Sequence, residues 1–248
     1  MSHPLASDLE LASTIAKQAG NALAARGARF EGVDKEEGRD IKLAADKAAE
    51  RLILDYLAEH SPYPVLSEEE GWVEGRGERL WVVDPLDGSS NYVRDFPLCA
   101  VSIALIENER PVLGVVYDFF RDEMFAGLVG HGATLNGAPM SVSDVSDRGR
   151  ATLMTGFPVR ADFSDAALTA MARDFASWKK IRMIGTAALA AAYVAAGRAD
   201  CYREQGSMLW DIAAGCALIE AAGGKVQLDM TALDAPMNVT AWNGRLDI

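Results

Sequence analysis

The amino-acid sequence predicts a layered α/β protein. Three observations support this fold class: two helical patterns open the chain, strand follows strand between residues 65 and 129, and helices and strands alternate after residue 150. Consecutive strands joined by short turns indicate an antiparallel sheet, whereas alternation indicates a layer in which helices cover a sheet. We therefore expect residues 1–145 to hold two helices and an antiparallel sheet, and residues 146–248 to form a smaller α/β half.

Both N-terminal helices are predicted from apolar residues at helical spacing. Ser7 is a suitable N-cap for a first helix that reaches residue 26. Its inward face is expected to contain Leu9, Ala12, Ile15, Ala16, Ala19 and Leu23. The polar, glycine-rich segment 27–38 is expected to be a loop. The second helix is predicted over 43–59, and its inward face is expected to contain Ala44, Ala48, Leu52, Tyr56 and their neighbours.

The strands of the first half are short apolar runs separated by turn residues. They are predicted at 65–66, 80–83, 100–107, 112–117 and 123–129. Asp84-Pro85 is expected to stop the second of these strands, and the glycine-rich segment 130–139 is expected to be a loop. In the second half we predict strands at 151–155, 181–184 and 199–203 and from residue 225 onward, with helices at 164–177, 187–196 and 210–222.

Charge and cysteine usage narrow the class of function. The chain has 24 Lys and Arg against 36 Asp and Glu, a formal net charge of −12. Bulk charge of this sign does not favour binding to nucleic acid or to an anionic membrane. The three cysteines, Cys99, Cys201 and Cys216, have no CxxC spacing and are expected to be reduced thiols. With no signal-peptide pattern and no apolar run long enough to span a bilayer, we expect a cytoplasmic protein.

The segment from Trp81 to Asn91 carries the most chemical information. An apolar strand leads into Asp84 and Asp87, which lie three residues apart around Pro85. Two carboxylates with a backbone carbonyl between them, that of Leu86, make a hard-oxygen set suited to Mg²⁺. The Gly-Ser-Ser-Asn sequence that follows can open a helix whose N–H groups face an anion. An ordinary Asp-Pro and Asp-Gly turn explains the same residues about equally well.

Further carboxylates stand where they could join this pair. Glu68 lies in a run of glutamates between two apolar strands, and Asp211 begins an alanine-rich helix. Asp46 lies within the second helix. Each has an ordinary explanation, since glutamate runs and helix carboxylates are usually solvated and Asp is common in the first turn of a helix.

The order of these elements resembles the inositol monophosphatase family, within the lithium-sensitive, metal-dependent phosphatases. The resemblance covers about residues 40–244, and its matching segments are 84–91, 210–215, 67–71, 185–187 and 132–137. It implies an αβαβα sandwich of the inositol monophosphatase and fructose-1,6-bisphosphatase type, and a homodimer. It also implies Mg²⁺ as the cofactor, with two or three ions at each site.

The resemblance assigns a role to each carboxylate. Glu68, Asp84 and the Leu86 carbonyl oxygen would bind one metal, and Asp84, Asp87 and Asp211 a second. Asp46 would lie near a weaker third metal. One departure concerns Asp46, because Leu43 stands where the family often has Thr. The other departure is a third glutamate, Glu70, after the usual pair, which makes Glu69 an alternative to Glu68 as the ligand or a residue that supports a ligand from outside the coordination sphere.

The same resemblance assigns residues to the substrate. Ser89, with Asp46 or Glu68, would orient an attacking water molecule in a reaction without a phospho-enzyme. Glu204 would bind substrate hydroxyl groups. The phosphate would lie against Gly88, Ser89 and Ser90, and the other side of the substrate would be lined by Gly185, Thr186 and Ala187.

The sequence therefore predicts a phosphomonoesterase acting on myo-inositol monophosphate or a similar polyol phosphate. Alternatives within the class are histidinol phosphate, fructose 1,6-bisphosphate and adenosine 3′,5′-bisphosphate. The last is less favoured because nucleotidase relatives carry Lys-Glu where this chain has Ser90-Asn91. An alternative of a different class is a metal-binding regulatory protein that contacts another macromolecule.

Overall fold

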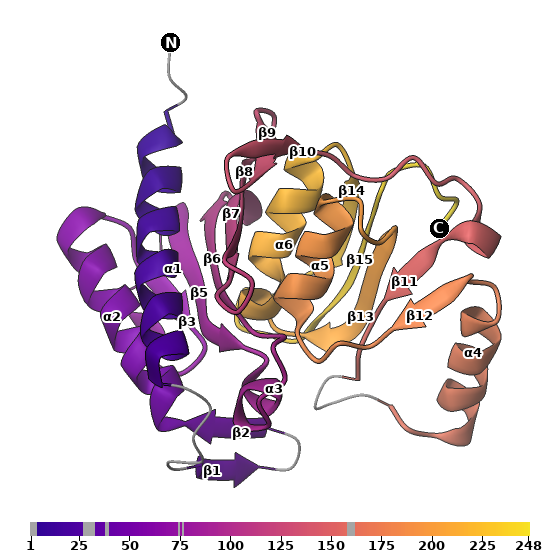
Figure 1. The fold of residues 1–248 in the computed structure, drawn as a ribbon, viewed down its shortest axis with the longest axis horizontal. Helices are drawn as coiled ribbons and strands as arrows, with labels where there is room; N and C mark the ends of the chain where they lie inside the picture. Colours follow the sequence, from indigo (N-terminus) through magenta and orange to yellow (C-terminus); the bar gives the residue numbers. More distant parts are fainter. Residues whose placement is uncertain (1–3, 27–32, 38–39, 74, 76, 158–161) are drawn as a thin grey trace.

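The structure is a computed structural model, and it describes residues 4–26, 33–37, 40–73, 75, 77–157 and 162–248. Five layers follow one another across the molecule (Figure 1). Helices α1 (Ala6–Arg26) and α2 (Ala44–His60) cover an eight-stranded sheet, and α5 (Ala187–Ala195) and α6 (Leu209–Ala221) separate it from a five-stranded sheet. Helix α4 (Asp165–Phe175) lies outside the second sheet. This confirms the predicted αβαβα architecture.

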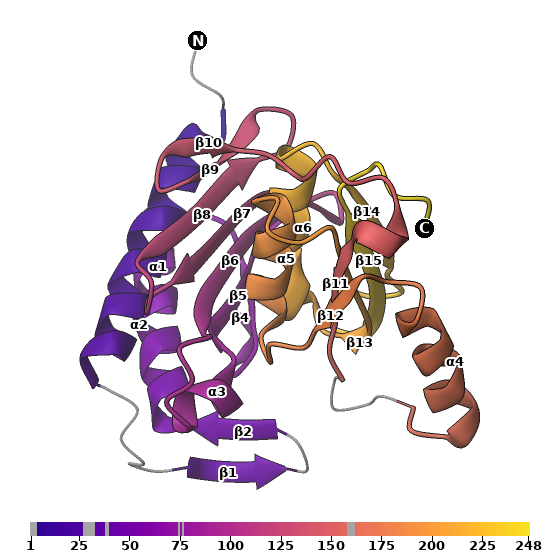
Figure 2. The same cartoon turned by 45° about the vertical axis from the view of Figure 1, so that its right-hand side comes forward.

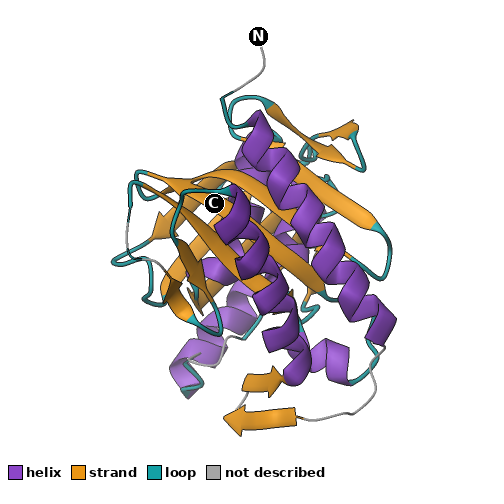
Figure 3. Cartoon of the chain, turned by 90° about the vertical axis from the view of Figure 1, so that its left-hand side faces the viewer, coloured by secondary structure: helices purple, strands orange, loops and turns teal. Residues whose placement is uncertain are grey.

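The eight-stranded sheet has the order β10-β9-β8-β7-β6-β5-β3-β4. Its strands are β3 (Val65–Ser67), β4 (Gly71–Val73), β5 (Arg79–Asp87), β6 (Ala100–Glu107), β7 (Arg110–Asp118), β8 (Glu123–Leu128), β9 (Gly132–Leu135) and β10 (Ala138–Met140). Neighbours are antiparallel except β3 and β5, which are parallel, so the sheet is mixed rather than purely antiparallel. Helices α1 and α2 lie across its outer face (Figure 3).

The five-stranded sheet is also mixed, with the order β12-β11-β13-β15-β14. Its strands are β11 (Thr152–Met154), β12 (Lys180–Arg182), β13 (Cys201–Ser207), β14 (Lys225–Asp229) and β15 (Met237–Trp242). Strand β11 is parallel to both neighbours, whereas β15 is antiparallel to β13 and β14. Smaller elements are the 3₁₀ turn η1 (Arg148–Arg150) and the short helix α3 (Ser89–Val93). The division at residue 145 into two units stays a prediction.

Several sequence predictions need correction. Strand β5 continues through Asp84-Pro85, because a bulge between Asp84 and Asp87 accommodates the proline that lacks an N–H. Residues 132–140, expected in a loop, form the hairpin β9–β10, and β15 was not expected. Residues 33–37, also expected in a loop, form β1 (Val33–Glu37), which pairs with β2 (Asp40–Leu43) beside α3 (Figure 2). The rest of that expected loop lies outside the described residues.

The buried face of α2 differs from the predicted one. Ala44 and Leu52 are exposed, and the buried residues are Asp46, Ala49, Glu50, Ile53 and Leu57. The prediction placed apolar residues inward, but this helix buries two carboxylates. In contrast, the predicted face of α1 is confirmed for Ala12, Ile15, Ala16, Ala19 and Leu23.

Helices α5 and α6 are buried almost all round because a sheet covers each side of the pair. Glycines allow this close packing. A Cβ added to Gly114 of β7 would lie 2.2 Å from the Ala214 carbonyl oxygen of α6, and one on Gly215 would lie 2.3 Å from the Ala191 Cβ of α5. Helix α6 thereby packs closely against strand β7 on one side and against helix α5 on the other. In the part of the chain that the structure describes, every helix is too short or too polar to cross a membrane.

Candidate metal and phosphate site

The parallel pairing of β3 and β5 brings the first two carboxylates together. Ser67 lies opposite Val83 in the register, so the residues that follow each strand leave the sheet at the same edge. The Glu68 N–H donates to the Val83 carbonyl oxygen at 3.2 Å, and the side chains of Glu68 and Asp84 share a hydrogen bond. Glutamates usually face solvent in such a run, but here the first one is placed against Asp84.

The bulge in β5 shapes the next residues. The Leu86 N–H donates to Asp84 Oδ1 at 3.0 Å, which folds the chain back over this carboxylate. The Leu86 carbonyl oxygen, expected to be a metal ligand, accepts a hydrogen bond from the Ser89 hydroxyl at 3.0 Å. Ser89 is therefore placed beside one of the expected ligands, the Leu86 carbonyl oxygen.

A glycine is required at the turn that opens α3. Gly88 has φ +94°, in the left-handed region, and a Cβ there would lie 2.8 Å from the Leu98 carbonyl oxygen. Ser89 and Ser90 follow in the first turn of α3, and Ser90 is exposed. Their backbone N–H groups are thus available at the helix start, as expected for residues that bind an anion.

Asp87 is held by the start of α5, a hundred residues further along the chain. Its Oδ2 accepts hydrogen bonds from the Thr186 hydroxyl and from the Ala188 N–H, the latter at 2.7 Å. Thr186 is also the N-cap of α5, accepting from the Leu189 N–H at 3.3 Å. Burial raises the pKa of Asp87 to about 6, although these hydrogen bonds lower it. The segment predicted to line the substrate thus contacts an expected metal ligand.

Two helices supply the remaining carboxylates. Asp211 lies in the first turn of α6, where its Oδ2 accepts from the Met208 N–H at 2.9 Å. Asp46 lies in the first turn of α2 and is buried. The charges of Asp211 and Asp46 both raise the pKa of Glu68, so both carboxylates lie close enough to Glu68 to affect its protonation.

The electrostatics of the cluster fit a cation. Burial raises the pKa values of both Glu68 and Asp84 well above their ordinary range, and the neighbouring carboxylates raise them further. Among the described residues, no three His, Cys, Asp or Glu side chains are already spaced to hold a metal ion. The donors are all hard oxygens, which suits Mg²⁺.

Glu204 lies on β13 at a different side of the site. Its Oε2 accepts a hydrogen bond from the buried Tyr202 hydroxyl at 2.9 Å, and a Cβ added to Gly156 would lie 2.9 Å from the same oxygen. Burial raises the pKa of Glu204 to about 7; the Tyr202 hydrogen bond lowers it and the charge of Asp87 raises it. Glu204 is therefore close enough to Asp87 to sense its charge.

The raised pKa of Glu204 predicts a pH dependence of stability. The folded state holds the proton more tightly than the unfolded chain, whose glutamate pKa is 4.5, so the stabilisation is complete below about pH 4.5. It is lost as the pH rises through about 7. We expect the melting temperature of Glu204→Gln, measured with EDTA, to rise relative to that of the wild type between pH 5 and pH 8. A difference between the two proteins that does not change with pH would contradict this.

Sequence reasoning missed two residues that support the site. Glu50 Oε1 accepts from the Ser67 hydroxyl and from the Glu69 and Glu70 N–H groups, at 3.1 and 3.2 Å for the two amides. It therefore fixes the turn that carries Glu68, and its place four residues after Asp46 on one helix face was the available signal. Glu69, the alternative ligand, contacts Glu50 through its backbone.

The second missed residue is Asn91 of α3. Its side-chain amide donates to the Leu98 carbonyl oxygen at 2.9 Å and to the Ile184 carbonyl oxygen at 2.8 Å. Asn91 thus joins α3 to the segment before α5. Gly185, with φ +74°, packs against it, since a Cβ there would lie 3.0 Å from the Asn91 amide nitrogen. The Asn at the end of the 84–91 motif therefore connects the two halves of the site.

Comparisons with known proteins identify the family of this chain. The model of the "Inositol monophosphatase family" matches residues 5–238. The chain is 38% identical over 229 residues to Nus factor SuhB of Escherichia coli, covering 90% of this chain and 85% of that protein. It is 40% identical over 224 residues to Nus factor SuhB of Xylella fastidiosa, covering 89% and 81%.

Solved structures show the same fold. The inositol monophosphatase of Anabaena (Nostoc) matches with a TM-score of 0.85 at 36% identity, covering 98% of this chain and 93% of that one. The IMPase of Thermotoga maritima matches with a TM-score of 0.84 at 31% identity, covering 96% and 93%. Sequence and structure together establish that the chain belongs to the inositol monophosphatase family.

Proposed function

We propose that this protein is a Mg²⁺-dependent phosphatase that hydrolyses a small phosphate monoester, with myo-inositol monophosphate or a similar polyol phosphate as its substrate. The observation that carries the proposal is the gathering of Glu68, Asp84, Asp87 and Asp211 beside the turn at Gly88. Four carboxylates repel one another and also repel a phosphate dianion. Such a cluster next to an anion-binding turn is useful only when cations lie between them.

The ligand assignments are those that the family resemblance implies. Glu68, Asp84 and the Leu86 carbonyl would hold one Mg²⁺, and Asp84, Asp87 and Asp211 a second, with Asp46 near a third. When bound, Mg²⁺ would neutralise the phosphate, lower the pKa of a water molecule and stabilise the leaving alkoxide. The Ser89 hydroxyl would turn from the Leu86 carbonyl oxygen, which it contacts at 3.0 Å, toward the attacking water molecule.

The substrate would lie between the two halves of the protein. Gly88, Ser89 and Ser90 would donate backbone N–H groups to the phosphate oxygens. Glu204 would bind hydroxyl groups with Oε1, because Tyr202 already occupies Oε2. Burial keeps this carboxyl group partly protonated near neutral pH, so it can both donate to and accept from hydroxyl groups. This favours a polyol over substrates without hydroxyl groups at that distance from the phosphate.

The test is phosphate release with Mg²⁺ from four substrates: myo-inositol 1-phosphate, histidinol phosphate, fructose 1,6-bisphosphate and adenosine 3′,5′-bisphosphate. We expect the inositol ester to be hydrolysed with the highest kcat/KM, and Glu204→Gln to raise its KM more than it lowers kcat. A higher kcat/KM for histidinol phosphate or for either bisphosphate would replace the polyol assignment. Release that does not depend on Mg²⁺ would contradict the metal assignment.

A second candidate function is regulatory. The relatives at 38% and 40% identity are both named Nus factor, whereas the two solved structures described above are named inositol monophosphatase and IMPase. The carboxylate cluster would then bind metal for stability, and the protein would act by contacting another macromolecule. Mg²⁺ binding measured by calorimetry, together with no turnover of any of the four esters, would favour this function.

We further propose that the protein is a homodimer, as the family resemblance implies.

A further inference from the structure

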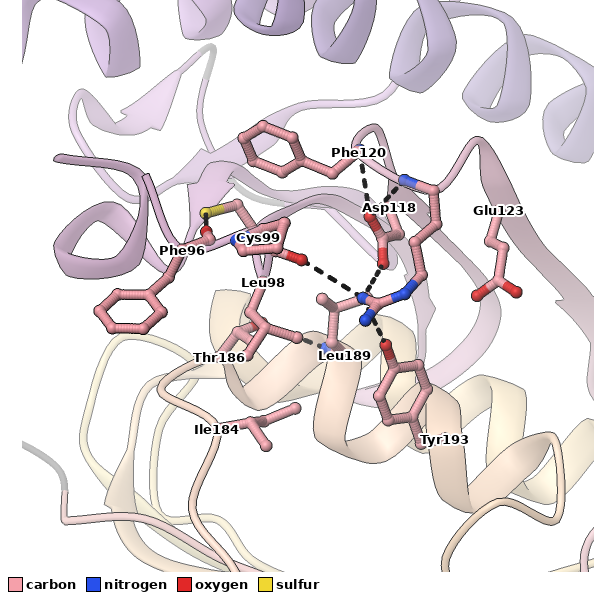
Figure 4. Close-up of polar contacts among 12 residues, drawn as sticks. Phe96, Leu98, Cys99, Asp118, Phe120, Glu123, Ile184, Thr186, Leu189 and Tyr193 are labelled. Carbon is pink, nitrogen blue, oxygen red and sulfur yellow. Dashed lines mark hydrogen bonds and ion pairs between the residues drawn. The ribbon is translucent and has the colours of Figure 1, made fainter. Parts of the chain in front are cut away.

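One arginine outside the carboxylate cluster contacts three separate segments. Arg121 lies in the turn between β7 and β8, and its Nη1 lies 3.1 Å from Asp118 Oδ2. The same nitrogen lies 3.1 Å from the Tyr193 hydroxyl oxygen on α5 and 3.3 Å from the Pro97 carbonyl oxygen in the loop after α3. Figure 4 shows the Asp118 carboxyl group and the Tyr193 hydroxyl group pointing toward one another, and Arg121 Nη1 donates to both.

The hairpin turn itself does not need all of these contacts. Asp118 Oδ1 already accepts the Phe120 and Arg121 N–H groups, each at 3.1 Å, and this closes the turn. The Asp118 side chain is fully buried, so its charge requires the guanidinium partner. The contacts of Arg121 with Tyr193 and Pro97 join the hairpin to other segments. A role of Arg121 in the hairpin turn alone does not explain these two contacts.

Both outlying contacts lead to the turn that carries Asp87. Tyr193 is on α5. At the start of this helix, the Thr186 hydroxyl and the Ala188 N–H donate hydrogen bonds to the Asp87 carboxylate. Pro97 precedes Leu98, whose carbonyl oxygen packs on Gly88, and Cys99, whose thiol donates to the Gly88 carbonyl oxygen at 3.3 Å. Arg121 thus holds α5 on one side of the 87–88 turn and the 97–99 loop on the other.

We propose that Arg121, paired with Asp118, is a positioning residue that sets the distance between α5 and the 97–99 loop, and through them the position of Asp87. This inference rests on the proposed function, because it treats Asp87 as a metal ligand. Arg121 does not touch the carboxylate cluster. Removing Arg121 should therefore weaken Mg²⁺ binding indirectly, because Asp87 is held less firmly. Groups that orient metal ligands from outside the coordination sphere usually act in this way.

Two variants and one control test the proposal. Arg121→Ala removes all three contacts, whereas Tyr193→Phe removes only the link to α5 and keeps the buried ion pair. Arg79→Ala is the control, since Arg79 is exposed to a similar extent, 37% against 44%, and also pairs with a carboxylate, that of Glu107. Arg79 begins β5, at the end of the strand away from Asp84 and Asp87. The Arg79→Ala substitution therefore removes an ion pair that does not contact the site.

The primary readout is calorimetric titration with Mg²⁺ alone, without substrate. We expect affinity to fall about tenfold in Arg121→Ala and about threefold in Tyr193→Phe, and to stay unchanged in Arg79→Ala. The second readout is amide hydrogen exchange of the metal-free proteins. Exchange in peptides covering 184–195 should be faster in both site variants than in the control.

The outcomes separate the two proposals. Wild-type protein that does not bind Mg²⁺ would overturn the proposed function itself. Wild-type binding with unchanged affinity and unchanged exchange in Tyr193→Phe and Arg121→Ala would overturn the role of Arg121 alone. If Arg121→Ala fails to fold because Asp118 is left buried without its partner, Tyr193→Phe decides the matter, since its ion pair is intact.

Discussion

Asp87→Asn is expected to abolish Mg²⁺-dependent phosphate release while leaving the protein folded. The amide can still accept from the Thr186 hydroxyl and the Ala188 N–H, so the contact with α5 survives. It no longer carries the negative charge that a metal ligand supplies. We expect phosphate release to fall by at least about 100-fold and Mg²⁺ affinity by about tenfold or more. Steady-state kinetics and calorimetry measure the two effects.

The stability of this variant should move in the opposite direction. Burial raises the pKa of Asp87 to about 6. At pH 7.5 and without metal, the buried side chain is therefore ionised in an environment that disfavours its charge, which lowers the stability of the folded protein. Asp87→Asn should therefore melt at the same temperature as the wild type, or higher, in EDTA. A large loss of stability would mean that Asp87 is a structural residue.

Asp200→Asn provides the matched control. Asp200 is about as buried as Asp87, with 6% of its surface exposed against 9%, and it accepts from the Thr152 N–H at 2.6 Å. It lies outside the carboxylate cluster. We expect it to lose about 1–3 kcal/mol of stability, because its other oxygen accepts from the Ser143 hydroxyl and an amide nitrogen cannot, and to keep Mg²⁺ binding. Loss of activity in both variants at a temperature where both are folded would remove the case for Asp87 as a ligand.

Among the glycines that the structure describes, Gly114 is the one at which substitution by alanine is expected to cause the largest loss of stability. The new Cβ would lie 2.2 Å from the Ala214 carbonyl oxygen and 2.9 Å from its carbonyl carbon, so it meets helix backbone and not a side chain that could rotate. Helix α6 or strand β7 would have to move. Overpacking usually costs about 1–3 kcal/mol, and a clash with backbone should exceed this.

The measurement for Gly114→Ala is thermal unfolding, with a fall of the melting temperature of about 10 °C or more. Because Asp211 lies in the first turn of α6, a shift of this helix should also weaken Mg²⁺ binding in whatever protein remains folded. Gly149→Ala is the control. Its Cβ would meet only the flexible Asp147 side chain, at 3.3 Å, in the exposed turn η1. Equal melting temperatures for the two variants would show that the β7–α6 contact can adapt.

Much of the candidate site could be predicted because its chemistry is local in the sequence. The Asp84–Asn91 segment carries two carboxylates, a proline and a glycine whose positive φ the turn requires. The positions of α5 and α6 also followed from sequence, since alanine-rich helices bounded by Gly-Thr and Trp-Asp are continuous patterns. Hairpins β1–β2 and β9–β10 did not follow, because short strands without apolar alternation carry little signal.

The buried face of α2 shows a different reason for failure. Hydrophobic periodicity assumes that carboxylates face water, whereas here Asp46 and Glu50 point inward. Glu50 does so because its Oε1 accepts from Ser67, Glu69 and Glu70 in a turn twenty residues away. A burial pattern that serves a site on another element cannot be read from the helix alone.

The sequence by itself determined which donors this protein has, and in what order: carboxylates after two strands and in the first turns of two helices, with a glycine turn between them. The tertiary structure decided which of them meet. Parallel pairing of β3 and β5 places Glu68 against Asp84, and packing of α5 and α6 between two sheets brings Thr186 and Asp211 to the same edge. Contacts between residues a hundred positions apart depend on strand order and helix packing. These are set by burial of the whole core, not by local residue pattern.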